Sequence, residues 1–258
     1  MIQETLVITQ NSSGLAHIAP MGIHVISRDG VYAENLSGTG SAISRDGVYA
    51  ASQQGTGAAT GSQDDFIILP FRPSTTLNNL LASKTAVINY CDDVRVFAGC
   101  LTGRRDWPLK PAEKIDGQVL DCALAHTEVE LVRVEDDQTR PKLFCKAVHN
   151  VNHAPFRGFN RAQYSVLEAA ILISRLGMIP LEKIQAEIDY LRIGLEKTAG
   201  DRELEAWSWL MTVIENFIAK EGVYATSQSG TGVAIARDGV NAENLPGAGS
   251  AIASEVDA

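Results

Sequence analysis

The chain has 258 residues, enough for one large domain or two modest ones with a substantial buried core. Its formal net charge of −9 argues against binding to nucleic acid or to an anionic membrane, because both surfaces require clustered Lys and Arg. No apolar run reaches the length of a membrane span, and the N-terminus lacks the features of a secretory signal. We therefore expect a cytoplasmic protein.

The first half of the chain has the pattern of an antiparallel sheet or barrel. Residues 4–25 hold two β-rich runs around a turn at residues 11–14. Further runs with alternating polarity and β-branched residues cover 66–71, 85–91, 94–101, 126–137 and 142–153.

A repeated segment interrupts this pattern. "ISRDGVYAENLSGTGSA" from residue 26 is followed directly by "ISRDGVYAASQQGTGAA", a step of 17 residues, and 221–258 carries two similar units. Short β-type pieces between Asp-Gly turns indicate a meander or a rung of a β-solenoid, although a flexible Gly/Ser/Ala linker has the same composition. We hypothesise that 26–63 and 221–258 pack together, or against a partner subunit, as one module.

Helical patterns occupy the remainder. Residues 74–83, "STTLNNLLAS", predict a short helix with Ser74 or Thr75 as its N-cap. From residue 158 the apolar period becomes helical, and Asn160, Pro180 and Asp201 begin three successive helices. Residues 157–220 therefore predict a three-helix bundle that lays its apolar face on the barrel.

The cysteines and two histidines give no metal pattern. The four cysteines lie far apart without a CxxC pair, so we expect reduced, partly buried thiols: Cys91, Cys100, Cys122 and Cys145. Cys145, His149 and His153 are spaced four apart, which predicts one shared face. No further ligand is evident, so we predict no metal site; proton transfer by the histidine pair and a structural or surface role both stay open.

The stretch "FRPSTTLNNL" (71–80) has what a phosphate monoester requires. Arg72 supplies a forked cation, while Ser74, Thr75 and Thr76 supply hydroxyl groups at the start of a helix whose free N–H groups point outward. Asn79 adds an amide one turn along. These residues predict phosphate or carboxylate binding; the alternative is a well-capped helix with a solvated arginine.

Two further stretches bear on a site. "HIAPMGIHV" (17–25) and "FRPSTTLNNL" (71–80) become neighbouring strands of a hairpin once the insertion is removed, and His17 is the better candidate of the first stretch for facing a ligand. "GRRDWPL" (103–109) reads as a surface turn, with a ligand-carboxylate or dimer contact by Arg104 and Arg105 as the alternative.

Five motifs in order resemble one family. "ETLVIT", "HIAPMG", "FRPSTTLNNL", "AVINYCDDVRVFAGCL" and "FRGFNRAQYSVLEAAIL" are similar to the domain of unknown function 447 family, a branch of the flavin reductase-like split barrels that bind FMN. The resemblance spans about residues 3–25 and 64–218. It implies an α+β fold, with an antiparallel split β-barrel at 1–25 and 64–156, followed by the three-helix bundle.

The resemblance also implies site residues, residue by residue. Those for the FMN phosphate are Arg72, Ser74, Thr75, Thr76 and Asn79. Those whose backbone lines the isoalloxazine are Ala19, Pro20, Met21 and Gly22, and those beside the ribityl chain are Asn89 and Tyr90.

The implied function is that of an FMN-binding flavoprotein. The resemblance points to a homodimeric oxidoreductase with a nicotinamide or pterin substrate and a link to methanopterin-dependent one-carbon metabolism; His17 would be its catalytic residue. Two alternatives stay open: a non-catalytic binding protein for flavin or a pterin precursor, and an interaction scaffold built on the repeats.

Overall fold

The computed structural model of the chain describes residues 1–26 and 65–228. All but the first residue of the repeat expected at 26–63, and most of the one expected at 221–258, lie outside these described residues. The hypothesis that the two repeats pack together therefore stays a prediction. Within the described part of the chain, no helix has the length and apolar content needed to cross a membrane.

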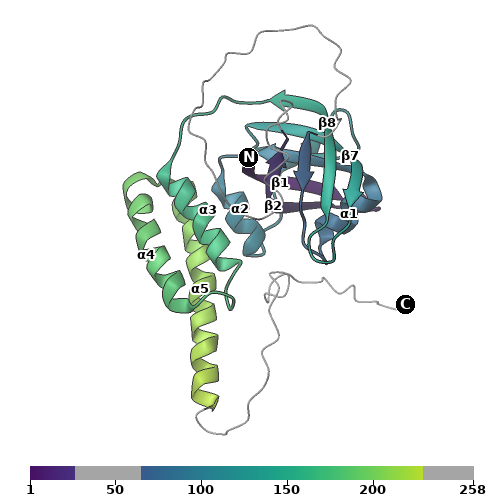
Figure 1. Ribbon diagram of the computed structural model, residues 1–258. Helices are drawn as coiled ribbons and strands as arrows, with labels where there is room; N and C mark the ends of the chain where they lie inside the picture. The colour runs from purple at the N-terminus through teal and green to yellow at the C-terminus, as the bar shows by residue number, and fades with distance from the viewer. Residues whose placement is uncertain (27–64, 229–258) are drawn as a thin grey trace, which may run out of the picture.

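Six antiparallel strands close a barrel, in the order β1-β2-β3-β8-β7-β4 (Figure 1). The strands are β1 (Ile2–Gln10), β2 (Ala16–Val25), β3 (Phe66–Ile68), β4 (Thr85–Tyr90), β7 (Ala125–Glu135) and β8 (Lys142–Asn152). A separate two-stranded sheet is formed by β5 (Leu109–Pro111) and β6 (Gln118–Leu120). The antiparallel strands predicted from the alternation of side chains, and the barrel that the family resemblance implies, are confirmed.

A hairpin spans the insertion, but its second strand is β3 and not the predicted 71–80, because a helix with Ser74 as its N-cap begins there. β2 pairs with β3 through His24 opposite Ile67 and Val25 opposite Phe66. The Ile26 N–H then donates to the Asp65 carbonyl oxygen at 2.9 Å. The chain thus leaves β2 and re-enters at β3 from adjacent positions, so the inserted residues do not interrupt the barrel.

Helix α1 (Thr75–Ser83) packs against the interior of the barrel. Ser74 is its N-cap, and its hydroxyl accepts the Leu77 N–H at 3.2 Å, as the sequence predicts. Its Leu77 and Leu80 are fully buried among inward-facing strand residues, which include Val7, Ile23, Ile68, Ile88, Val129 and Leu143.

Residues 94–101 form helix α2 (Val94–Leu101), so the strand predicted there is wrong. This helix is apolar on nearly all sides because it is buried on two faces, which hides the helical period. Ala98 belongs to the core of the helical bundle, whereas Phe97 packs with Leu6 on the outer wall of the barrel. Asp93 caps its N-terminus. α2 therefore joins the two halves of the molecule.

The three-helix bundle is confirmed. It consists of α3 (Arg161–Ile173), α4 (Leu181–Thr198) and α5 (Asp201–Gln228), lying on the far side of α2 from the barrel (Figure 1). Asn160 caps α3, accepting the Ala162 N–H at 2.8 Å. α5 runs past the predicted boundary at residue 220 to Gln228, because extending a helix costs less than nucleating one. The first eight residues of the expected C-terminal repeat are thus helical.

Candidate functional site

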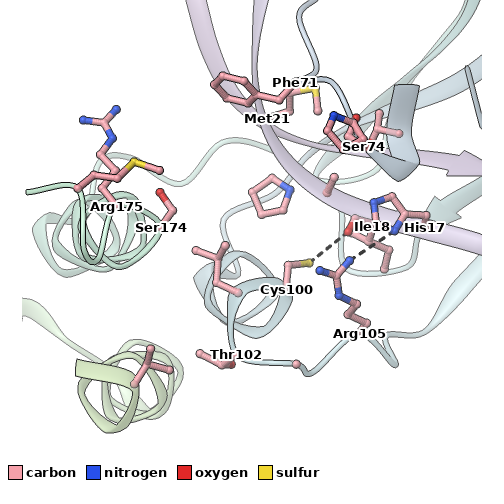
Figure 2. A pocket seen from close by; sticks show the side chains of 18 of the residues that line it. His17, Ile18, Met21, Phe71, Ser74, Cys100, Thr102, Arg105, Ser174 and Arg175 are labelled. Carbon is pink, nitrogen blue, oxygen red and sulfur yellow. Dashed lines mark hydrogen bonds between the residues drawn. The ribbon is translucent and has the colours of Figure 1, made fainter. Parts of the chain in front are cut away.

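A cavity of about 840 Å³ lies between the barrel and the bundle. The barrel contributes β2 and the start of α1, and the helices contribute α2, the α3–α4 turn and α5. In Figure 2, Ser74, His17 and Arg105 lie on the barrel side, with Ser174 and Arg175 opposite. Because its walls come from both halves, the cavity exists only when they are packed together.

The lining is strongly cationic. Among the described residues that line it there is no Asp or Glu, although the chain as a whole is acidic. Its cations are Arg72, Arg105, Arg140, Arg175 and Lys220. Such a cavity concentrates a positive potential and attracts an anionic ligand.

The N-terminus of α1 opens onto this cavity through Ser74 and Thr76. The capping Ser74 hydroxyl takes up the Leu77 N–H. The N–H groups of Thr75 and Thr76, in the first turn, have no preceding helical carbonyl to bind. This end of the helix therefore carries partial positive charge and amide donors toward an anion.

Arg72 stands next to this helix start but is engaged elsewhere. Its Nη2 donates to Asp136 Oδ1 at 2.7 Å, and the two side chains are 44% and 82% exposed. An ion pair this exposed contributes less than about 1 kcal/mol, because water screens it. Arg72 can therefore exchange this partner for a ligand phosphate at little cost.

β2 presents an open edge along the same cavity. It pairs with β1 from Ala16 to His24, but among the described strands its other edge meets β3 only at His24 and Val25. The cavity-lining stretch Ile18–Met21 therefore has backbone groups that no strand covers on that side. A flat ring can lie against such an edge and bind backbone N–H and C=O groups.

His17 lines the cavity beside Arg105 (Figure 2). Arg105 Nη1 approaches His17 Nδ1 at 3.4 Å; since a guanidinium only donates, Nδ1 is the acceptor and the ring proton is on Nε2. Burial, together with the charge of Arg105, lowers the pKa of His17 to about 4. The imidazole is thus neutral near pH 7.

Two family models match this chain. The "Protein of unknown function (DUF447) N-terminal domain" matches residues 56–154, and "Protein of unknown function (DUF447)" matches residues 160–212, together more than half of the chain. The chain belongs to the DUF447 family. A comparison with curated proteins found no similar sequence.

Several solved structures are similar to this chain to different degrees. An FMN-bound DUF447 protein from Methanosarcina mazei is 17% identical, with a TM-score of 0.58 over 82% of this chain and 94% of its own. Pseudomonas fluorescens 2-nitrobenzoate 2-nitroreductase is 19% identical, with a TM-score of 0.40 over 58% and 64%. A Thermus thermophilus FMN-binding protein is 13% identical, with a TM-score of 0.39 over 59% and 71%. This DUF447 chain therefore has the split-barrel fold of the first of these.

The structure brings six of the residues named from sequence in this DUF447 chain to one cavity, together with the proposed catalytic His17. They are Ala19, Pro20, Met21, Arg72, Ser74 and Thr76. Gly22 does not line it: a Cβ there would come within 3.0 Å of Ile2 Cγ2 across the strand pair, which gives the glycine a packing reason. The Thr75 side chain is exposed to solvent, so this residue contributes only its backbone N–H at the first position of α1.

Three other predicted residues lie outside the cavity lining, one on α1 and two on β4. Asn79 Nδ2 donates to Thr9 Oγ1 at 3.2 Å, tying α1 to β1. Asn89 is fully buried and joins three strands: Nδ2 donates to the Leu6 and Val87 carbonyl oxygens, and Oδ1 accepts the Leu120 N–H at 2.9 Å. Tyr90, partly buried at the end of β4, is likewise outside the lining.

Sequence reasoning missed most of the cations. Arg105, whose sequence context favours a surface turn and leaves a ligand contact open, lines the cavity, whereas Arg104 lies over the Trp209 ring with its Cζ 4.4 Å from the centroid. Arg140, Arg175 and Lys220 come from segments distant in sequence and carry no local motif. From the sequence alone, these three cations cannot be distinguished from ordinary surface residues.

The expectation that Cys145 and His149 share a face is wrong. β8 carries an irregularity: Val129 pairs with Ala147, but the preceding Glu128 pairs with His149, which leaves one extra residue on β8. Such a bulge reverses the alternation of side chains. Cys145 therefore faces the barrel core, whereas His149 faces outward.

His149 and His153 form a cluster with His126, a residue that sequence reasoning missed. His126 Nδ1 and His153 Nε2 are 2.8 Å apart, and His149 Nε2 lies 3.2 Å from Glu113 Oε2. Within 1–26 and 65–228, no group of three His, Cys, Asp or Glu side chains is placed to hold a metal ion.

The depressed pKa of His17 makes stability depend on pH. The unfolded chain takes up this proton near pH 6.5, whereas the folded chain does so only near pH 4, so the free energy of unfolding falls as pH drops between these values. We expect His17→Gln to remove about 2 kcal/mol of that fall between pH 7 and 4.5. Urea denaturation at each pH measures it; parallel profiles for wild type and variant would contradict the assignment.

Proposed function

We propose that this chain binds FMN in the cavity between barrel and bundle and acts as an FMN-dependent oxidoreductase. The observation that carries the proposal is the cavity itself: it is lined by cations without a carboxylate and opens onto a helix N-terminus beside Arg72 and Ser74. Its volume of about 840 Å³ lies within the range of cofactor pockets. The FMN-bound DUF447 protein of the same fold supports this choice of ligand.

In this proposal the start of α1 holds the phosphate. The Thr75 and Thr76 N–H groups and the hydroxyls of Ser74 and Thr76 supply donors, and Arg72 adds a charged one after leaving Asp136. Such bonds are charge-assisted and strong, so the phosphate anchors the molecule at the barrel end of the cavity.

The open edge of β2 would hold the ring system. Ala19, Pro20 and Met21 offer backbone groups there, while Ile18 and Phe71 add apolar surface that excludes water. The flavin supplies the hydride chemistry when bound. His17, neutral with its proton on Nε2, acts as a hydrogen-bond donor to the reacting molecules rather than as a charged acid.

Comparison of FMN with riboflavin tests the phosphate site. We expect the purified protein to release FMN, identified by absorbance and mass spectrometry, and the flavin-stripped protein to bind FMN at least about 30-fold more tightly than riboflavin, from charged hydrogen bonds worth about 2 kcal/mol or more. Flavin fluorescence titration measures both constants. Equal affinity for the two flavins would exclude a phosphate anchor at α1.

Anaerobic reduction separates an oxidoreductase from a flavin carrier. We expect NADH, NADPH or a reduced pterin to bleach the bound flavin, and the donor that does so identifies the substrate class, including the methanopterin-linked one. If dithionite reduces the flavin but none of these donors does, the protein binds flavin without acting as an oxidoreductase on them. Light scattering on the same sample tests the expected homodimer.

A further inference from the structure

Two cysteines that are 31 positions apart in sequence face each other outside the cavity. Cys91 follows β4, Cys122 lies between β6 and β7, and their Sγ atoms are 3.7 Å apart. A disulfide requires these atoms to close to about 2.05 Å, so a shift of less than 2 Å separates the thiols from a covalent bond. Neither residue belongs to the cavity lining, so the pair is separate from the proposed flavin site.

The two thiols are inequivalent. Cys122 is exposed to solvent, whereas Cys91 is partly buried and its sulfur accepts the Asp93 N–H at 3.3 Å. The Cys91 sulfur also lies 3.7 Å from the Cys122 carbonyl oxygen. An oxidant from solution therefore reaches Cys122 first and meets Cys91 as the second, sheltered thiol.

The titration of the pair follows the same asymmetry. The hydrogen bond from the Cys91 S–H stabilises the Cys122 thiolate and lowers the pKa of Cys122 despite partial burial. The same hydrogen bond, together with burial, raises the pKa of Cys91. Cys122 is thus the better nucleophile near neutral pH, because the thiolate is the reactive form.

We propose that Cys91 and Cys122 form a reversible dithiol–disulfide site that reacts with low-molecular-weight disulfides. The Cys122 thiolate attacks one sulfur of the disulfide RSSR, forming a mixed disulfide and expelling RS⁻. Cys91 then loses its proton and attacks the Cys122 sulfur, which forms the intramolecular bond and expels the second RS⁻. The protein dithiol is oxidised by two electrons and RSSR is reduced to two RSH.

Cys100 and Cys145 provide an internal control. They are 3% and 0% exposed and contact backbone carbonyl oxygens of Ile18 and Leu143 respectively, each at 3.6–3.7 Å. Burial raises the pKa of Cys100 to about 11. We expect neither thiol to react in the folded protein.

The site has a structural consequence at α2. Asp93, whose N–H contacts the Cys91 sulfur, also caps α2 and binds Arg95 with Oδ2–Nη2 at 2.7 Å. Closing the disulfide draws this connection toward the β6–β7 connection. Oxidation therefore acts on the N-terminus of the helix that joins barrel and bundle.

The experiment uses the full chain, in the dark, with oxidised glutathione as the disulfide. Samples are acid-quenched, alkylated under denaturing conditions and mapped by peptide mass spectrometry. We expect two of the four cysteines to be lost to alkylation, a Cys91–Cys122 cross-linked peptide within one chain, and full reversal by reduced glutathione. Cys100 and Cys145 should stay fully alkylated.

Two variants separate the steps. In Cys91→Ser the glutathione adduct should accumulate on Cys122, because the resolving thiol is missing. In Cys122→Ser no adduct should form on Cys91 over the same time. A stable glutathione adduct on wild-type Cys122, a cross-link between two chains, or four alkylated cysteines after exposure to oxidised glutathione would each overturn the proposal.

Discussion

Replacement of Glu128 by glutamine is expected to lower the free energy of unfolding by about 3 kcal/mol. Glu128 is fully buried, and its two carboxylate oxygens accept the N–H groups of Glu113, Lys114 and Ile115 at 2.7, 2.8 and 3.0 Å. A glutamine amide turns an N–H toward those donors and leaves at least one of them unbonded in the interior. Urea denaturation of the two proteins at equal FMN concentration measures the difference.

The effect of Glu128 is expected to depend on pH in a defined direction. Burial opposes its ionisation, but the three backbone N–H groups and His126 outweigh burial and lower the pKa of this carboxyl. A depressed carboxyl pKa contributes stability that is present above the unfolded value near pH 4.3 and is lost as pH falls through the folded value. Wild type and variant should therefore converge at low pH.

Glu130→Gln is the matched control for Glu128→Gln. Glu130 is two residues further along β7 but exposed, so its replacement should change the free energy of unfolding by no more than about 0.5 kcal/mol. Equal effects of the two substitutions would mean that the Glu128 carboxylate does not hold the 113–115 turn.

Replacement of Arg72 by alanine is expected to weaken FMN binding by about 1.5–3 kcal/mol, which is roughly a 10- to 150-fold rise in the dissociation constant. The loss reflects one charged donor at the phosphate, beside Ser74 and the start of α1. Affinity for riboflavin should change little, because it has no phosphate. Fluorescence titration of both flavins against wild type and variant provides the measurement.

Asp136→Ala distinguishes a phosphate-binding Arg72 from a structural one. Asp136 holds the Arg72 guanidinium at 2.7 Å, so its removal frees the cation and should leave FMN affinity unchanged or raise it. If the ion pair instead served only to hold the chain in place, both substitutions would impair stability alike and neither would change the ratio of FMN to riboflavin affinity.

Local pattern predicted much of this fold, because each signal acts within a few residues. Period-two alternation located the barrel strands, and the capping residues Ser74 and Asn160 located two helix starts. α2 was missed because burial on two faces removes the polar stripe that marks an amphipathic helix. Asp93, which caps it, was a signal in the sequence that could have indicated the helix start.

The candidate site likewise has residues that a local pattern predicts and residues whose roles depend on tertiary structure. Arg72, Ser74 and Thr76 lie within five residues at a helix start, so their convergence is a local property. Asn89 carries an attractive amide for a ligand, yet its bonds are all satisfied within the barrel. Only the paired strands show which polar side chains already make all their hydrogen bonds within the barrel.

The sequence by itself determined an antiparallel sheet or barrel, a helical bundle and a group of cationic and hydroxyl side chains at the start of α1. It did so because strand alternation, helix caps and helix-end amides depend on neighbours along the chain. Only the tertiary structure decided that Arg105, Arg175 and Lys220 surround the same cavity, and that Cys91 meets Cys122. Packing of the bundle on the barrel gathers the cations, and pairing of β4 with β7 brings the two cysteines together. No spacing along the chain encodes either distance.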